Sequence, residues 1–147
     1  MTFLCQKTQP KIVERSATTL PQTAQTAYFT VTGRVLITQI VGEVITANIG
    51  GVETLAELIS NPTTLADANI CAQLDINGDL IGTFYTLSGT LTDAMIATTS
   101  GAVAAQSAPI LVSAGTIDLK TSSSTTGQTK WTVHYIPLDS GSSVAEA

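Results

Sequence analysis

One histidine and two pairs of carboxylates are the side chains whose types and spacing come nearest to a catalytic set. His134 alternates outward from the aromatic residues of its predicted strand, so we expect it to face solvent or an interface. It has no partner nearby in the sequence that would make it a general base. Asp75 with Asp79, and Glu53 with Glu57, could meet in space, but such pairs are common on solvated faces. Because no G-x-S-x-G, P-loop or H-E-x-x-H pattern occurs, we predict a protein that is not an enzyme and needs no cofactor.

The segment 75–79, with the sequence DINGD, could supply calcium ligands from its two aspartates and its asparagine. A calcium loop also has glycine directly after the third ligand and a carboxylate at position twelve, where this chain has Leu80 and Thr86. The same segment contains Asn-Gly, a strong hairpin signal because both residues tolerate positive φ. We therefore favour a hairpin between strands at 70–76 and 80–87, with calcium as the alternative, and predict no metal site.

Cys5 and Cys71 are the two cysteines, and two thiols with one histidine are too few for a zinc site. Residues 1–10 lack the charged start and apolar core of a signal peptide. No window approaches the roughly 20 apolar residues that span a bilayer. We therefore expect a protein assembled in a cytoplasm, without a membrane partner, in which both cysteines remain thiols.

The run 26–46 predicts the strands around which the other elements pack. Phe29, Val31, Val35 and Ile37 occupy every second position and alternate with a mostly polar set, as in a half-buried sheet. The many aromatic and β-branched residues of this run also favour a strand over a helix.

The alternation blurs in the second half of this run, because Ile40 and Val44 share parity with Leu36. Either a bulge shifts the register near residues 39–42, or both faces of the strand are buried by a second sheet or a second subunit. We favour burial on both faces, and we expect Leu36, Ile40 and Val44 to form a self-association face.

Further strands are predicted by alternation towards the C-terminus, at residues 109–113, 115–122 and 129–136. Residues 52–60 fit either a short helix or a strand. The polar, proline-containing stretch 1–25 predicts an extended N-terminal arm, and residues 140–147 predict a Gly/Ser tail. Together these patterns predict an all-β protein, with an antiparallel, jelly-roll-like β-sandwich domain over residues 26–139.

Charged residues make up 12% of the 147 residues, about half the usual share of roughly 25%. Two interpretations fit: a threonine-rich β protein with neutral strand faces, or a surface that meets copies of itself or a larger assembly, since interface cores are depleted in charge. The net charge of −5 argues against nucleic-acid binding, which depends on Lys and Arg neutralising phosphates. A chain of this length most simply forms one domain.

Two segments carry a resemblance: LPQT at 20–23 leading into YFTVTGRV at 28–35, and KWTVHYIPLD at 130–139. In pattern and composition, residues 20–139 resemble the short, Thr- and Ala-rich virion structural proteins of tailed bacteriophages. The resemblance implies a particle component, most like a capsid decoration (cement) protein on the capsid surface that stabilises the head by bridging capsid subunits. It implies the major capsid protein as partner and a homo-oligomer, often a trimer. It transfers no residue-level site.

A protein that bridges subunits needs a rigid body and arms that reach, so we predict that Phe3, Leu4, Ile12 and Val13 form a capsid-binding arm. Two alternatives stay open: a tail or head–tail joining component, and a carbohydrate-binding β-sandwich module of a fibre. The carbohydrate module would need exposed aromatics, yet most of the seven aromatic residues are expected in the core.

Overall fold

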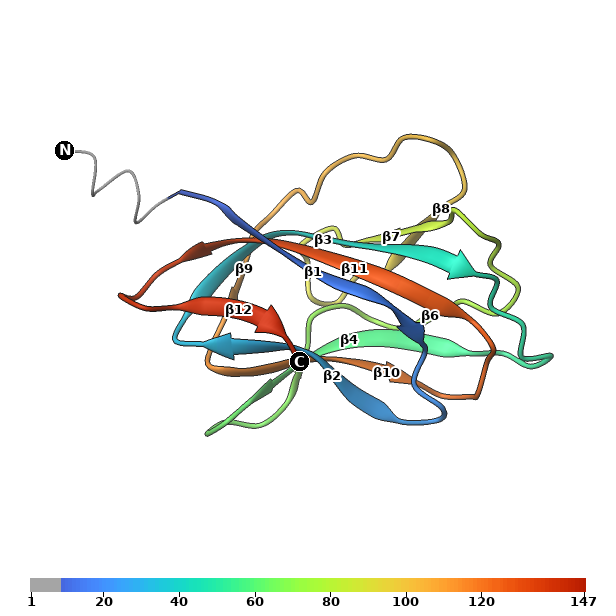
Figure 1. Cartoon of the computed structure of the whole chain (residues 1–147), viewed down its shortest axis with the longest axis horizontal. Helices are drawn as coiled ribbons and strands as arrows, with labels where there is room; N and C mark the ends of the chain where they lie inside the picture. The colour runs from blue at the N-terminus through green and yellow to red at the C-terminus, as the bar shows by residue number, and fades with distance from the viewer. Residues whose placement is uncertain (1–8) are drawn as a thin grey trace.

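The computed structural model describes residues 9–147, which form two six-stranded antiparallel sheets packed face to face (Figure 1). Sheet A contains β1 (Lys11–Thr19), β11 (Gln128–Pro137), β3 (Val35–Thr46), β7 (Phe84–Thr86) and β8 (Ile96–Thr98) in that order, with β9 (Ile110–Val112) also paired to β3. Sheet B contains β12 (Ser143–Glu146), β2 (Gln25–Thr32), β10 (Gly115–Thr121), β4 (Leu55–Pro62) and β5 (Ala68–Asn69), with β6 (Leu74–Asp75) also paired to β4. The predicted all-β antiparallel sandwich is confirmed. Within residues 9–147 no helix is long and apolar enough to cross a membrane.

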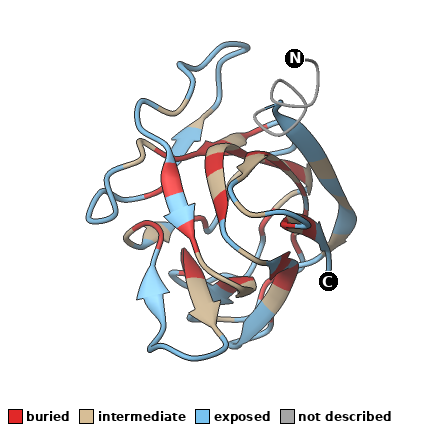
Figure 2. Cartoon of the chain, turned by 90° about the vertical axis from the view of Figure 1, so that its left-hand side faces the viewer, coloured by how far each residue is buried: buried red, intermediate tan, exposed pale blue. Residues whose placement is uncertain are grey.

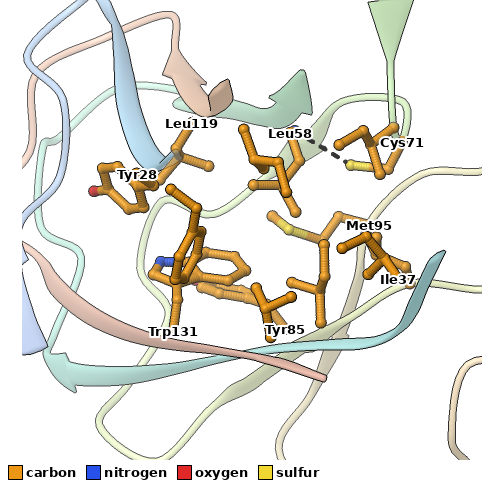
Figure 3. Close-up of a cluster of buried hydrophobic side chains, with 14 of the residues drawn as sticks. Tyr28, Ile37, Leu58, Cys71, Tyr85, Met95, Leu119 and Trp131 are labelled. Carbon is orange, nitrogen blue, oxygen red and sulfur yellow. Dashed lines mark hydrogen bonds between the residues drawn. The ribbon is translucent and has the colours of Figure 1, made fainter. Parts of the chain in front are cut away.

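The core lies between the sheets and is centred on aromatic side chains from three strands (Figure 3). Trp131 stacks on Tyr85 at a centroid distance of 6.2 Å and meets Tyr28 edge-on at 6.4 Å. The indole fits because its cross-strand neighbour is Gly42, where a Cβ would lie 2.8 Å from the ring. The inward side chains of both sheets fill the remaining core, as the period of two in a strand requires.

A bulge at Thr38 changes which residues of β3 face the core. Ile37 lies opposite Tyr135 and Gln39 lies opposite His134, so Thr38 is one extra residue on β3. Buried side chains therefore fall at odd positions before the bulge and at even positions from residue 40 to 44. The opposite face of β3 is only half-buried. The second sheet therefore covers only one face of β3, and the alternative of a bulge accounts for the blurred pattern; burial of the other face by a second subunit stays a prediction.

Both ends of the described chain differ from the predicted arm and tail. Residues 11–19 pair with β11 as the edge strand of sheet A, and residues 143–146 pair with β2 as the edge strand of sheet B. The Arg15 guanidinium donates to the Ala147 carbonyl at 2.7 Å and lies over the Tyr28 ring, which joins these two edges. Each segment pairs its backbone with one neighbouring strand, so the sandwich extends well beyond residues 26–139.

Asn77-Gly78 forms a turn, but it is not the predicted hairpin. The strand before it, β6, pairs with β4 in sheet B, whereas the strand after it, β7, pairs with β3 in sheet A. The turn therefore carries the chain from one sheet to the other, with Gly78 at φ +85°. The ambiguous stretch 52–60 contributes strand β4 and not a helix.

Candidate interaction surface

The groups that could do chemistry do not converge on one site. His134 is half-buried on the outer face of sheet A. The Asp75 carboxylate accepts the backbone N–H groups of Thr54 and Asn77 at 3.0 Å each, so it caps its own loop. Across residues 9–147, no three His, Cys, Asp or Glu side chains lie close enough together to hold a metal ion.

Asp79 belongs to a hydrogen-bonded chain that closes one end of the core. Tyr85 Oη donates to Asp79 Oδ2 at 2.6 Å, and the buried Asn48 Nδ2 donates to Tyr85 Oη at 2.8 Å. Burial raises the pKa of Asp79, although the bond from Tyr85 acts in the opposite direction. Burial also raises the pKa of the Tyr85 phenol, which keeps its proton and remains a donor. This chain of contacts explains the DINGD segment structurally.

Cys71 is a buried thiol of the core, where its Sγ accepts the Leu58 N–H at 3.4 Å (Figure 3). Burial raises the pKa of this thiol to about 11. It therefore stays protonated and unreactive near neutral pH. Cys5 lies outside the described residues.

The outer face of sheet A carries a row of aliphatic side chains. Ile136 lies directly opposite Leu36, which in turn lies directly opposite Leu111. Directly opposed side chains on one sheet face are in contact range, so the three form one strip across β11, β3 and β9. Ile12 extends the strip onto the edge strand β1, where it lies opposite His134 and diagonal to Ile136, two residues further along β11; it is 63% exposed. These four residues are named the aliphatic row.

The aliphatic row runs into a groove of about 270 Å³ between β9 and the β4–β5 hairpin, where the two sheets part. Leu65, Leu91 and Leu111 line it and are 72%, 47% and 62% exposed, and Ile110 forms part of its buried lining. Figure 2 views the molecule from this end, with buried segments between the layers and exposed loops around them. This cavity is named the β9 groove. A concentration of exposed aliphatic side chains of this kind is typical of a protein–protein contact.

A charged pair borders the β9 groove. Arg34, one of the residues that line it, holds the Asp139 carboxylate in a bidentate contact, with Nη2 to Oδ1 at 2.6 Å and Nε to Oδ2 at 3.0 Å. The hydrogen bonds from Arg34 lower the pKa of Asp139. The groove therefore has an apolar floor and a polar rim, as interfaces commonly do.

A second apolar surface lies at the opposite end of the sandwich. The loops 47–54 and 76–83 are joined there by backbone hydrogen bonds between Asn48 and both Gly78 and Asp79. They expose four aliphatic side chains, Ile49, Val52, Leu80 and Ile81, each more than half exposed. These four residues are named the end patch.

The predicted self-association face is wrong as a set. Leu36 lies in the aliphatic row, but Ile40 and Val44 are 1% and 0% exposed and lie in the core. The extra residue at the bulge reverses the parity of β3, so the three side chains point to opposite faces.

The predicted capsid-binding arm is divided by the structure. Ile12 and Val13 lie on opposite faces of the edge strand β1, with Ile12 exposed and Val13 half-buried against the core. They therefore cannot contact a partner from one surface. Phe3 and Leu4 lie outside the described residues, so their role stays a prediction.

No periodic pattern in the sequence marks the β9 groove. Leu65 and Leu91 are isolated large aliphatic residues within polar stretches, which is a signal that could have been used. Their convergence with Leu111 depends on which strands pair, because β9 joins β3 while the β4–β5 hairpin belongs to the other sheet.

The aromatic side chains offer little to a sugar ligand. Of the six aromatics in residues 9–147, five are buried and only Phe84 is partly exposed. A carbohydrate-binding face normally presents aromatic rings to the flat faces of sugars. The described surface therefore disfavours the carbohydrate-binding alternative.

Comparison of the chain with protein-family models, curated proteins and solved structures gives no match. The conclusion from this site thus rests on the chain's own geometry: the described part of the protein presents two separate apolar surfaces on an all-β sandwich.

Proposed function

We propose that this protein is a virion structural protein of a tailed bacteriophage, a capsid decoration (cement) protein that binds the capsid surface and stabilises the head. It acts as a homo-oligomer, a trimer being the expected form, with the major capsid protein as partner. The proposal involves no catalysis and no cofactor.

The observation that carries the proposal is the presence of two apolar surfaces at opposite ends of one sandwich. A decoration protein has two kinds of neighbour, copies of itself and the subunits of the shell, and it needs a surface for each. The β9 groove with the aliphatic row, and the end patch, supply these two surfaces. We assign the groove to self-association and the end patch to the shell. The charged fraction of 12% supports burial of much of this surface in an assembly.

Copy number on purified particles tests the proposal directly. Quantitative mass spectrometry of particles from a phage that encodes this chain should give hundreds of copies, in a fixed ratio to the major capsid protein. A handful or tens of copies would instead indicate a tail or head–tail joining component. Absence from particles would overturn both assignments.

Binding to particles that lack the protein tests the end patch. The double variant Leu80→Asp, Ile81→Asp should bind at least about tenfold more weakly than the wild type, because two charges would enter an apolar contact. The control Leu138→Asp places one such charge on an exposed aliphatic side chain at the other end of the sandwich, and the single variant Leu80→Asp provides the comparison at equal charge. Equal binding by the double variant and the wild type would remove the end patch from the shell contact.

A further inference from the structure

We propose that the end patch binds a segment of a partner protein in which apolar side chains are accompanied by lysine or arginine. The inference rests on the proposed decoration role, which assigns the end patch to the shell, and it names the chemistry of the shell segment that the patch contacts. It follows from the uneven distribution of charge along the chain and over the fold.

The part of the chain that builds the end patch contains no basic residue. All six lysines and arginines lie outside residues 35–119, whereas eight of the eleven carboxylates lie within that stretch. Both loops of the end patch, 47–54 and 76–83, belong to it. The end patch therefore lies in the acidic part of a molecule whose net charge is −5.

The two lysines on strands that reach this end of the sandwich are already paired. Lys120 Nζ lies 3.7 Å from Glu57 across β10 and β4, and Lys130 Nζ lies 3.2 Å from Glu43 across β11 and β3. Each lysine thus balances an acid of its own sheet. The carboxylates of the end-patch loops have no such partner within the described part of the chain.

Three carboxylates border the end patch. Glu53 is exposed, and its carboxylate has no hydrogen-bond or ion-pair partner among residues 9–147. Asp75 is exposed and is held beside it, because its Oδ1 accepts the N–H of Thr54 at 3.0 Å. Burial raises the pKa of Asp79, and the negative charge of Asp75 adds to that effect. A positive charge from a partner would relieve this repulsion.

An apolar groove adjoins these carboxylates. Leu80 and Ile81 of the end patch line a cavity of about 370 Å³, which continues to the partly exposed Phe84 and to residues 99–101. The cavity can accept an apolar side chain, while the acidic border can accept a basic one. A partner that fits both features presents apolar and basic side chains together.

Other occupants fit the end patch less well. No three carboxylates of the described chain lie close enough together to hold a metal ion, so a cation must arrive on a side chain. Nucleic acids and anionic lipids carry the same sign of charge as the patch. In an end-to-end contact between two copies, each copy would bring the same three carboxylates to the interface. A basic, apolar segment of a different protein avoids this repulsion.

Association with particles that lack the protein tests the sign of the charge. Charges at the border of a contact mainly change the association rate and its salt dependence, so Glu53→Lys should lower the rate about fivefold in low salt. The difference should shrink below about twofold in about 1 M salt, where charges are screened within about 3 Å. Equal rates for the wild type and Glu53→Lys in low salt would overturn the proposal.

Glu146→Lys is the matched control for this test. It makes the same change of net charge at an exposed residue of β12, on the edge of sheet B opposite to the edge that holds β6. Its association rate should stay within about twofold of the wild-type rate, because the charge is remote from the end patch. An equal loss in Glu146→Lys and Glu53→Lys would mean that only net charge matters, and would overturn the proposal.

A second test reverses the sign of a charge at one position of the patch. Leu80 is 71% exposed, so Leu80→Asp and Leu80→Lys should both fold, as urea titration can verify. Both variants lose the apolar contact, but only the aspartate suits a basic partner. Leu80→Asp should therefore bind particles at least about threefold more tightly than Leu80→Lys in low salt. Equal affinity, or tighter binding by Leu80→Lys, would overturn the proposal.

Light scattering without particles separates a shell partner from a second copy. Glu53→Lys should have the same mass as the wild type at each protein concentration, because the end patch does not contact another copy. A changed oligomeric state would assign the patch to self-association and overturn the proposal.

This inference and the decoration role fail in different ways. If the wild type does not bind particles at all, the decoration role is wrong, and the inference falls with it. If the wild type binds particles but the sign of the charge at positions 53 and 80 makes no difference, the inference alone is wrong and the decoration role stands.

Discussion

The outer faces of the two sheets differ in the side chains they present: sheet B carries a hydrogen-bonded polar network, and sheet A carries the aliphatic row. On sheet B, the buried Asp118 carboxylate accepts hydrogen bonds from Gln25 at 2.8 Å, Asn61 at 3.1 Å and Thr116 at 2.6 Å. On sheet A, the outer face carries the aliphatic row, in which Leu36 has Ile136 and Leu111 as its neighbours across the strands. One face satisfies its polar groups within the chain, and the other leaves apolar groups at the surface.

A second contact extends the polar face of sheet B. The buried Glu57 accepts Asn69 Nδ2 at 2.9 Å and lies 3.7 Å from Lys120 Nζ. Buried carboxylates cost free energy unless they are hydrogen-bonded, and both acids on this face meet that condition. From this difference we infer that the polar side chains on the outer face of sheet B stabilise the fold, whereas the outer face of sheet A is available to a partner.

The largest expected effect separates the two faces of a single strand. Ile40→Asp would place a carboxylate without a partner in the core and should lower the free energy of unfolding by more than about 4 kcal/mol. Leu36→Asp, four residues earlier, should leave the fold intact and weaken self-association, because Leu36 lies in the aliphatic row. Urea titration and light scattering check the pair. If both variants unfold equally, the outer face of sheet A contributes to folding and the contrast with sheet B is lost.

The next effect tests the polar network of sheet B. Asp118→Ala should lower the free energy of unfolding by about 2 kcal/mol, because the amides of Gln25 and Asn61 lose their common acceptor. Asp118→Asn retains one acceptor oxygen and should cost less than the alanine variant. Neither change should alter the oligomeric state measured by light scattering. A loss of assembly in either variant would show that sheet B also serves a partner.

A smaller effect concerns the charged rim of the β9 groove. The hydrogen bonds from Arg34 lower the pKa of Asp139 in the folded state below its ordinary value of 3.8. The contribution of this pair to stability is therefore present above pH 3.8 and is lost as the pH falls through the lowered pKa. Melting temperatures measured from pH 6 to pH 2 should fall more steeply for the wild type than for Asp139→Asn. Parallel curves would mean that the rim contact does not persist in solution.

The smallest effect belongs to the ion pair between the half-exposed Lys120 and the buried Glu57 on sheet B. Lys120→Ala should change the free energy of unfolding by less than about 1 kcal/mol, since the ammonium is half-exposed and its distance to Glu57 is 3.7 Å. Added salt should change the wild type and this variant alike, as measured by urea titration. A loss comparable to that of Asp118→Ala would contradict the view that neutral hydrogen-bond donors sustain this face.

The fold class was predictable from the local sequence pattern. The predictions that failed concern which strands pair and with what register, and these depend on residues far apart in the sequence. Alternation along residues 26–37 and 129–136 identified strands with their buried faces. A bulge near residues 39–42 was one of two alternatives, and the sequence could not decide between them because an extra residue produces the same pattern as burial on both faces. The Asn77-Gly78 turn was recognised as a turn, but no local signal states that the strands on its two sides join different sheets.

The candidate surface was less predictable than the fold. Leu36 lies half-buried on the outer face of sheet A, whereas Ile40 and Val44, predicted on the same face, lie in the core because the bulge reverses the parity. The β9 groove is formed by three segments that are distant in the sequence. Its leucines come together because β9, which pairs with β3 in sheet A, lies beside the β4–β5 hairpin of sheet B. Such convergence depends on strand order, which the sequence pattern does not contain.

The position of the single tryptophan has a practical consequence for all of these measurements. Trp131 is buried in the core, where its indole contacts Tyr28, Tyr85 and Gly42. Its fluorescence should emit at short wavelength in the native state and shift to the red only when the sandwich opens. Spectroscopy thus reports folding without interference from assembly, and a mass measurement on the same sample reports assembly alone.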